Sequence, residues 1–403
     1  MSQKPQSNVR RRHVLYVPGY DPMPPRRYRE LYRTEGKKQA AISGYSLKVQ
    51  GVTGKGVQYH WNVQAQMDGE KTDTRVEFLL WDDIVTQSMQ STILHTYWKL
   101  LRTLWLYVRS GALPALYRLR RAPILAAMYP VVVLLGQILF AIFVAKSLAT
   151  IIGGITGLGV GAFVIAGILM LFRRLDRRFF AYYLLHAFAF WAQADGRMPQ
   201  VLMPRIEGFS DRICAALDSE VDEVLIVGHS SGAHLAVVLA AEVLRRRPRV
   251  EKLALLTLGQ AIPVISFLPQ AWDLRRDLRQ VSMRPDITWI DVSAPGDGAC
   301  FALADPVAVS GIAPPYGARF GPKVISAAFS HTLSLETRRK TRWKFFRRHI
   351  QYLCAFDTPL EYDYFRITAG PQSLKNRFSE RGSSASCIEK PFSPHQTIVS
   401  KDA

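Results

Sequence analysis

The most constraining feature of the sequence is a short turn between a strand-like run and a helix-like run, within residues 221–244. Residues 224–227 (VLIV) are apolar and mostly β-branched, which is typical of a buried strand. The Ala-, Leu- and Val-rich residues after the turn favour a helix packed against a sheet. The turn, residues 228–232, reads Gly-His-Ser-Ser-Gly, a G-x-S-x-G pattern. A strand that passes directly into a helix indicates an α/β architecture.

The spacing of this turn suits a reactive serine. Ser230 would lie on a tight, strained turn with its hydroxyl projecting above the edge of the sheet. Glycines two positions before and after it remove the Cβ atoms that would collide with neighbouring elements. The N-terminus of the next helix adds unpaired N–H groups and a positive dipole end, which favour an oxyanion. In these residues the chain resembles the nucleophile elbow of the α/β-hydrolase family.

The resemblance implies a Ser-His-acid triad in which the acid and then the histidine follow the serine along the chain. Asp297 lies on a glycine-flanked turn just after a predicted strand, residues 287–292, and is the expected acid. Asp305, later in the same long loop, is the alternative acid. Asp291 lies inside the strand, where a structural role is expected.

Two histidines follow this acid and precede the polar C-terminal residues. His331 directly precedes a helical run, which is the position that the family uses, and it is the expected general base. His349 is the other candidate, but it lies inside a predicted helix, residues 340–353, where packing is expected. His229 and His234 flank the serine and do not fit the family order.

The oxyanion hole is expected at a loop that follows an early strand, residues 13–17. Where the family often has His-Gly, this chain has Pro18-Gly19, and proline has no N–H to donate. The resemblance therefore implies donors from Gly19 or Tyr20, together with the N–H of Ser231.

Two long apolar runs, residues 122–145 and 147–172, carry no charged side chain and are separated by Lys146. Each exceeds the ~20 residues that cross the hydrocarbon core of a bilayer. The sequence therefore predicts a tight transmembrane hairpin that turns near Lys146. Small residues every four positions would let the two helices approach closely; they are Gly153, Gly157 and Gly161.

Basic residues flank both ends of the predicted hairpin. Because the chain would cross the membrane twice, both soluble parts lie on one side, and the positive flanks predict that this side is the cytoplasm. We expect an integral protein of a bacterial inner membrane. The flanking arginines are Arg118, Arg120, Arg121, Arg173, Arg174, Arg177 and Arg178.

Composition narrows the class further. A chain of 403 residues with 48% hydrophobic residues is not a disordered protein. Its net charge of +20 suits an anionic membrane surface or nucleic acid, but no nucleic-acid-binding motif is present, so no nucleic-acid partner is expected. The four cysteines lack metal-ligand spacing, and neither a metal nor a cofactor is expected.

The predicted fold is α/β: a mostly parallel, α/β-hydrolase-like sheet with helices on both faces and an inserted two-helix transmembrane hairpin. Residues 45–49 and 58–65 predict a β-hairpin at the sheet edge. The expected domain organisation is two parts of the hydrolase-like domain (1–83 and 173–369), an amphipathic interfacial helix (84–121), the hairpin (122–172) and a flexible polar tail (370–403).

The expected function is a membrane-anchored serine hydrolase, an esterase, lipase or thioesterase that acts on an acyl ester derived from lipid. Two alternatives stay open. An acyltransferase would use the same triad, and a non-catalytic hydrolase-like scaffold would use the basic surface to bind anionic lipid or a partner.

Overall fold

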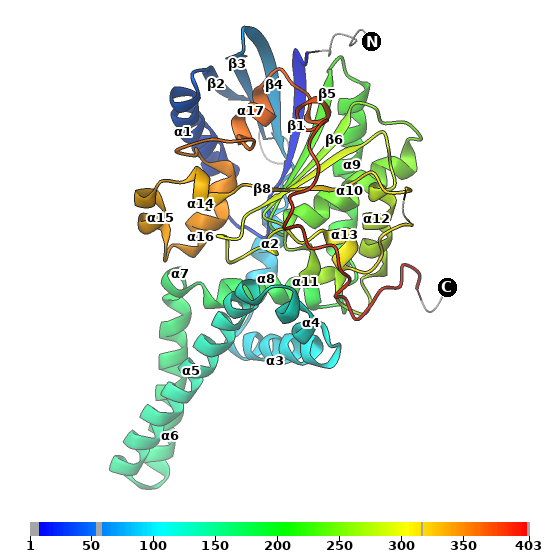
Figure 1. The fold of residues 1–403 in the computed structure, drawn as a ribbon. Helices are drawn as coiled ribbons and strands as arrows, with labels where there is room; N and C mark the ends of the chain where they lie inside the picture. Colours follow the sequence, from blue (N-terminus) through cyan, green and yellow to red (C-terminus); the bar gives the residue numbers. More distant parts are fainter. Residues whose placement is uncertain (1–7, 54–58, 316, 401–403) are drawn as a thin grey trace.

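The computed structural model describes residues 8–53, 59–315 and 317–400. Its centre is a mixed, mostly parallel sheet in the order β2-β3-β4-β1-β5-β6-β7-β8 (Figure 1). Neighbouring strands from β4 through β1 to β8 pair in parallel, while β3 is antiparallel to both β2 and β4. The strands are β1 (Arg11–Val17), β2 (Ser46–Thr53), β3 (His60–Met67), β4 (Glu70–Phe78), β5 (Glu223–His229), β6 (Leu253–Leu258), β7 (Thr288–Ser293) and β8 (Lys323–Ser326).

This sheet confirms the predicted α/β class, including the antiparallel β-hairpin at one edge. The residues that join β2 to β3, 54–58, lie outside the described residues. The sequence pattern did not predict β8, since four residues give too short a run for a period to emerge.

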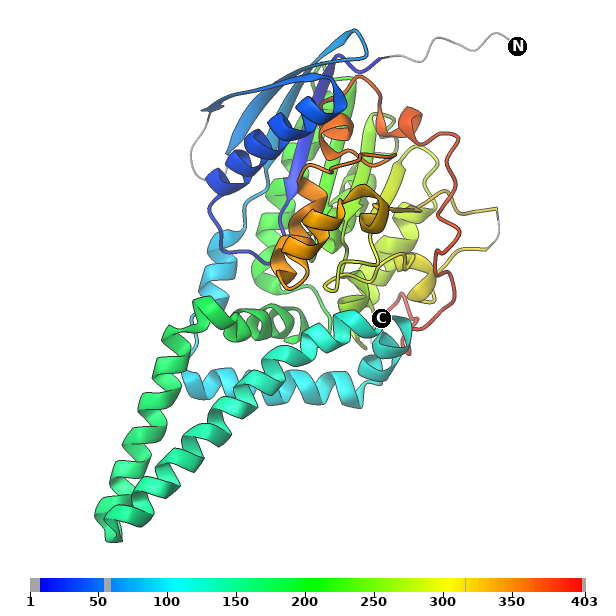
Figure 2. The same cartoon turned by 60° about the vertical axis from the view of Figure 1, so that its left-hand side comes forward.

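Alternate residues of the central strands face two separate apolar cores. Leu15 and Val17 of β1 belong to one core, and Val14 and Tyr16 belong to the other. This alternation follows from the period of two in a strand, and it buries both faces, as a parallel sheet requires (Figure 2). The first core is closed by α9 (Met203–Asp218), α10 (Gly232–Arg246) and α12 (Trp272–Ser282), and the second by α1 (Pro25–Ser43), η3 (Ile350–Leu353) and α17 (Tyr364–Ala369).

Of the helices between β4 and β5, the first seven form the lower part of the molecule, and η2 (Gln200–Leu202) and α9 follow them. Two of them, α5 and α6, lie side by side and project away from the α/β body, while α3 lies across its base (Figures 1 and 2). The seven are α2 (Asp82–Met89), α3 (Ile93–Arg109), α4 (Ala112–Leu119), α5 (Arg121–Ile152), α6 (Gly154–Arg174), α7 (Asp176–Phe179) and α8 (Ala181–Ala192).

The α5–α6 hairpin presents its apolar side chains outward. Both helices are long and apolar enough to cross a membrane, and only 22% and 17% of their most apolar windows are buried. A core helix of a soluble protein would be mostly buried instead. The helices touch through the glycines of α6, since a Cβ on Gly157 would lie 2.5 Å from the Ala149 carbonyl oxygen and one on Gly161 would lie 3.3 Å from that of Ala145.

The turn of this hairpin differs from the prediction. Lys146 continues α5 without interruption, and the chain reverses at Gly153 and Gly154, which have φ angles of 73° and 57°. Glycine adopts this left-handed region without a steric penalty, whereas a single lysine gives a helix no reason to end. Gly153 therefore supplies the turn rather than a helix contact.

The predicted interfacial helix, residues 84–121, is divided into α2, α3 and α4. Thr92 caps α3 by accepting the N–H of His95 at 3.2 Å. One face of α3 is apolar and open, with every side chain on it at least 55% exposed. That face consists of Leu94, Trp98, Leu101, Trp105 and Val108.

The described C-terminal residues pack against the α/β body, in contrast to the flexible tail that their polar composition predicts. Leu374 and Phe378 are buried in the second core. Arg275, which is itself buried, donates to the Thr397 carbonyl at 2.7 Å. Amino-acid composition does not predict this packing, because a few contacts to residues distant in the sequence hold the C-terminal segment.

Candidate active site

Ser230 occupies a strained position between β5 and α10. Its φ of 59° lies in the left-handed region, which is uncommon for a residue with a side chain. The turn is so tight that a Cβ on Gly228 would lie 2.7 Å from the Ala233 Cα. A Cβ on Gly232 would lie 2.5 Å from the Pro18 carbonyl oxygen and closer still to that of Val17. Both glycines of the G-x-S-x-G pattern are therefore required by space.

The loop after β1 lies directly against this turn. A Cβ on Gly19 would lie 3.2 Å from the Ser230 Cβ, so the two residues are in close contact. The Tyr20 N–H donates to the Ser231 Oγ at 2.8 Å, which ties the loop to the turn but occupies that N–H. Of the two predicted loop donors, Gly19 is the one whose N–H has no hydrogen bond to another described residue.

Asp297 and His349 form a buried hydrogen-bonded pair. Asp297 lies in the loop after β7, and His349 is the last residue of α16 (Phe345–His349). The His349 Nδ1 lies 2.8 Å from the Asp297 Oδ2. Burial raises the pKa of Asp297, but the charge and hydrogen bond of His349 outweigh it and leave that pKa below its ordinary value. Since the carboxylate is ionised, the Nδ1 carries the proton and donates it.

Two further donors hold the Asp297 carboxylate in place. The Ala299 N–H donates to its Oδ1 at 2.9 Å, and the Tyr352 hydroxyl donates to its Oδ2 at 3.1 Å. The Tyr352 oxygen also accepts the Ala294 N–H at 3.0 Å. Tyr352 is thus a positioning residue that sequence reasoning missed, because no local pattern marks a tyrosine that contacts a loop far away in the chain.

The other nitrogen of His349, the Nε2, is buried and is left without a hydrogen-bond partner in the described part of the chain. His229, the residue before Ser230, donates from its Nε2 to the His349 carbonyl at 2.9 Å, and the two rings lie 4.7 Å apart. Burial, followed by the charge of His349, lowers the pKa of His229 to about 3, so His229 stays neutral. The elbow and the Asp297–His349 pair are therefore joined through His229.

The structure does not bring His331 to Asp297. His331 lies in the single helical turn α14 (Phe329–Thr332), and its side chain is exposed. That turn buries Phe329 and Thr332, which directs the histidine between them outward. His349 was set aside because a helix interior suits packing, but the predicted helix is broken into shorter pieces and His349 lies at the end of one. Both histidines follow the acid along the chain, so order alone could not have separated His349 from His331.

The other two acids have structural partners. The Asp305 Oδ1 accepts the N–H groups of Val307 and Ala308, both at 3.0 Å, and its second oxygen pairs with Arg319. Asp291 faces Thr257 on the neighbouring strand and accepts its hydroxyl at 2.6 Å. Neither acid has a hydrogen bond to a histidine in the described part of the chain.

One group in the described ranges has ligand atoms close enough to hold a metal: Asp305, Cys387 and Glu389. The Asp305 oxygens are already occupied, and the adjacent Arg319 guanidinium repels a cation. This arrangement suits an ion pair better than a metal centre.

We compared the chain with protein-family models, with curated proteins and with solved structures, and none of the three comparisons gives a match. The function of the chain is therefore inferred from the geometry of the site itself.

Proposed function

We propose that this chain is a membrane-anchored serine hydrolase of the α/β-hydrolase type that cleaves acyl esters. Ser230 is the nucleophile, His349 the general base and Asp297 the acid that orients it. The observation that carries the proposal is the buried Asp297–His349 pair, whose free Nε2 lies in the neighbourhood of a strained serine turn. The strained φ of Ser230 and the unpaired buried nitrogen of His349 both lower the stability of the fold. Features of this kind are typical of functional sites.

In the acylation step, the Ser230 Oγ attacks the ester carbonyl carbon while its proton passes to the His349 Nε2. Asp297 stabilises the resulting imidazolium through the Nδ1–H. The N–H groups of Gly19 and Ser231 would stabilise the oxyanion, since Tyr20 already donates to Ser231. The intermediate then expels the alcohol, which takes the proton from His349. Water attacks the acyl-enzyme by the same route and releases the carboxylic acid.

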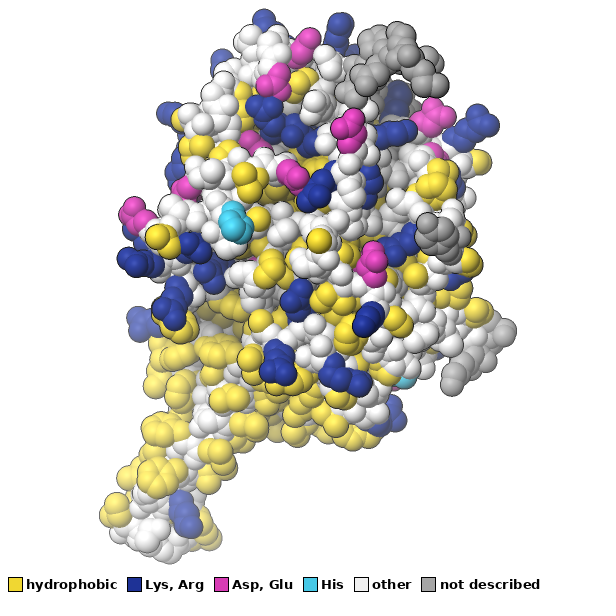
Figure 3. Space-filling model, in the orientation of Figure 1, with side chains coloured by type: hydrophobic (Ala, Val, Ile, Leu, Met, Phe, Trp, Pro, Cys, Tyr) yellow, Lys and Arg dark blue, Asp and Glu magenta, His cyan; other side chains and the backbone are white. Residues whose placement is uncertain are grey.

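The lower part of the molecule supports a membrane location. The exposed apolar surfaces of α5, α6 and the open face of α3 are continuous (Figure 3). The Arg109 guanidinium lies 4.3 Å from the centre of the Trp105 ring, a pairing that suits the boundary between head groups and acyl chains. The proposed site thus lies in a domain held at a lipid surface, which favours a lipid-derived substrate.

Labelling with a fluorophosphonate probe tests the proposal. We expect the purified full chain in detergent to be labelled, Ser230→Ala to abolish labelling, and His349→Ala to slow it by about 10³-fold or more. Asp297→Asn is expected to slow it strongly as well, because the imidazole would lose its orienting carboxylate.

His331→Ala is the matched control, since it removes an exposed histidine from the same side of the sheet. Its labelling rate should equal that of the unaltered chain. Loss of labelling in His331→Ala with retention in His349→Ala would restore the sequence-based assignment. Absence of labelling in the folded unaltered chain would contradict the enzyme proposal.

A further inference from the structure

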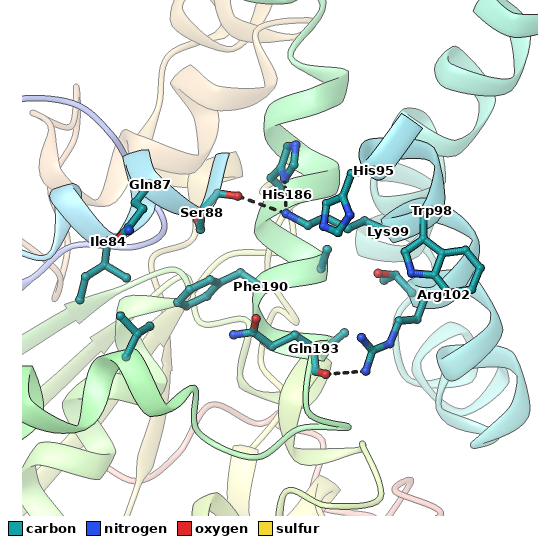
Figure 4. A pocket seen from close by; sticks show the side chains of 14 residues that line it. Ile84, Gln87, Ser88, His95, Trp98, Lys99, Arg102, His186, Phe190 and Gln193 are labelled. Carbon is teal, nitrogen blue, oxygen red and sulfur yellow. Dashed lines mark hydrogen bonds between the residues drawn. The ribbon is translucent and has the colours of Figure 1, made fainter. Parts of the chain in front are cut away.

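A separate cavity lies between the base of the α/β body and α3. It has a volume of about 380 Å³ and is lined by residues from α2, α3 and α8. Figure 4 shows Trp98, Lys99 and Arg102 of α3 facing His186 and Phe190 of α8 across it. The volume is in the range of small-molecule sites, and neither Ser230 nor His349 lines it.

The lining is basic without compensation. Of the 14 lining residues, Lys99, Arg102, His95 and His186 are basic and none is acidic. Within the described chain, no salt bridge involves Lys99 or Arg102. Lys99 donates to the Ser91 Oγ at 2.8 Å, and its Nζ lies 3.4 Å from the His186 Nδ1. The Lys99 ammonium is thus held beside a buried imidazole, and Arg102 donates to the Gln193 carbonyl at 2.7 Å, with no carboxylate in the lining to neutralise either charge.

The uncompensated positive charge of this cavity affects the pKa of His186. Burial, followed by the charge of Lys99, lowers the pKa of His186 to about 4. Burial also lowers the pKa of Lys99 itself. A bound anion would offset both effects, because it would stabilise every positive charge around the cavity.

The remaining lining is apolar and reaches the open face of α3. Trp98 belongs to that face, is 60% exposed and also lines the cavity. If the face of α3 rests on the bilayer, the cavity opens at the depth of the lipid head groups. Basic pockets at that depth typically bind phosphate-bearing head groups.

We propose that this cavity binds the phosphate head group of an anionic phospholipid, with Lys99 and Arg102 as its main ligands. The inference rests on the membrane location in the proposed function but not on catalysis. Tyr20 links the cavity to the active-site loop, since its hydroxyl lies 2.6 Å from the Oγ of Ser88, a lining residue. An occupied cavity would therefore hold α2 and α3 beside the oxyanion loop.

Binding to the full chain in detergent tests the site, using native mass spectrometry and a titration with soluble lipids. The probes are dihexanoyl phosphatidic acid, dihexanoyl phosphatidylcholine and inorganic phosphate. We expect the phosphatidic acid to bind more tightly than both others. Each basic residue is worth about a fivefold change in affinity, so Lys99→Gln/Arg102→Gln should weaken binding by about 25-fold.

Arg109→Gln/Arg118→Gln is the matched control, because it removes two exposed charges from the same region outside the cavity. It should change the affinity for phosphatidic acid by less than about twofold, because exposed charges outside the cavity contribute little to binding. Arg102→Gln alone, an exposed position, serves if the double variant does not fold, and should weaken binding by about fivefold.

Three outcomes would overturn the inference. Equal losses in the cavity and control variants would show diffuse attraction to basic residues. Inorganic phosphate that binds as tightly as phosphatidic acid would identify a free phosphate ligand instead of a lipid. If none of the three probes binds, the proposed head-group site is refuted. Fluorophosphonate labelling of the same samples separates these results from a failure of the proposed catalysis.

Discussion

At the scale of single residues, three glycines make the tight turn around Ser230 sterically possible. Gly19, Gly228 and Gly232 lie where a Cβ would meet backbone or side-chain atoms at 3.2 Å or less. Their absence of side chains lets β1, β5 and α10 converge on Ser230. The serine in turn takes a φ of 59°, which the surrounding contacts have to maintain. Close packing therefore acts on this turn together with hydrogen bonds such as that from the Ser230 N–H to the Leu258 carbonyl at 2.9 Å.

Substitution of one glycine tests this conclusion. A Cβ at position 232 would lie 2.5 Å from the Pro18 carbonyl oxygen, so Gly232→Ala should destabilise the fold by about 1–3 kcal/mol. Gly208→Ala on α9 is the control, because nothing lies within 4 Å of its Cβ position. It should be neutral or stabilising by about 0.5–1 kcal/mol. Thermal unfolding in detergent measures both, and equal behaviour of the two variants would refute the steric explanation.

At the scale of elements, β6 and β7 carry a buried polar pair, Thr257 and Asp291. Thr257 and Asp291 are register partners, and the Trp289 Nε1 donates to the Thr257 Oγ1 at 3.1 Å. The Asp291 Oδ2 is buried without a partner in the described residues. Burial raises the pKa of Asp291 to about 7. The pair therefore stabilises the sheet best when Asp291 is protonated.

The sign of the pH effect follows from this shift. Between the ordinary pKa of 3.8 and about 7, the folded chain binds more protons than the unfolded chain, so the free energy of unfolding falls as the pH rises. Asp291→Asn keeps an acceptor for Thr257 but does not titrate. It should stabilise the protein at pH 8 by about 2–4 kcal/mol and much less near pH 4.

Melting temperatures of Asp291→Asn and the unaltered chain across this pH range provide the measurement. Glu207→Gln is the control, since Glu207 is an exposed carboxylate on α9. A stabilisation by Asp291→Asn that does not depend on pH would show that the pKa of Asp291 is the same in the folded and the unfolded chain, and would contradict the proposed effect of burial.

At the scale of the whole molecule, two surfaces with different chemistry meet at the base of the α/β body. The hairpin and α3 expose apolar side chains (Figure 3), while arginines lie in the last turn of α4 before the hairpin and in the last turn of α6 at its end. With about 1.5 Å per residue, the 21 residues of α6 span roughly 31 Å, which matches the hydrocarbon core. In the proposed membrane location, the hairpin tip and the α/β body would therefore lie on opposite sides of a bilayer.

Cysteine accessibility tests this topology. Ile155→Cys lies beside the hairpin turn and Trp343→Cys lies on the α/β body, at positions 87% and 86% exposed. In intact bacterial spheroplasts, a membrane-impermeant maleimide should label Ile155→Cys, and should label Trp343→Cys only after lysis. Labelling of both positions before lysis would contradict a spanning hairpin, and the reverse pattern would invert the orientation.

The sequence by itself determined the features that depend on neighbours along the chain. The run of residues 224–227 with the G-x-S-x-G turn fixed a strand, a strained serine and a helix, because sterics within a few residues dictate them. The apolar runs likewise fixed two long helices, although the position of their turn depended on Gly153 and Gly154 rather than on Lys146.

Only the tertiary structure decided which groups meet. Asp297 contacts a histidine 52 residues away, and the choice of His349 over His331 depended on which side of a helical turn faced the interior. Tyr352 and the packed C-terminal residues were hidden for the same reason. A hydrogen bond between distant residues leaves no periodicity in the sequence, since its partners are brought together only when the sheet and its two cores form.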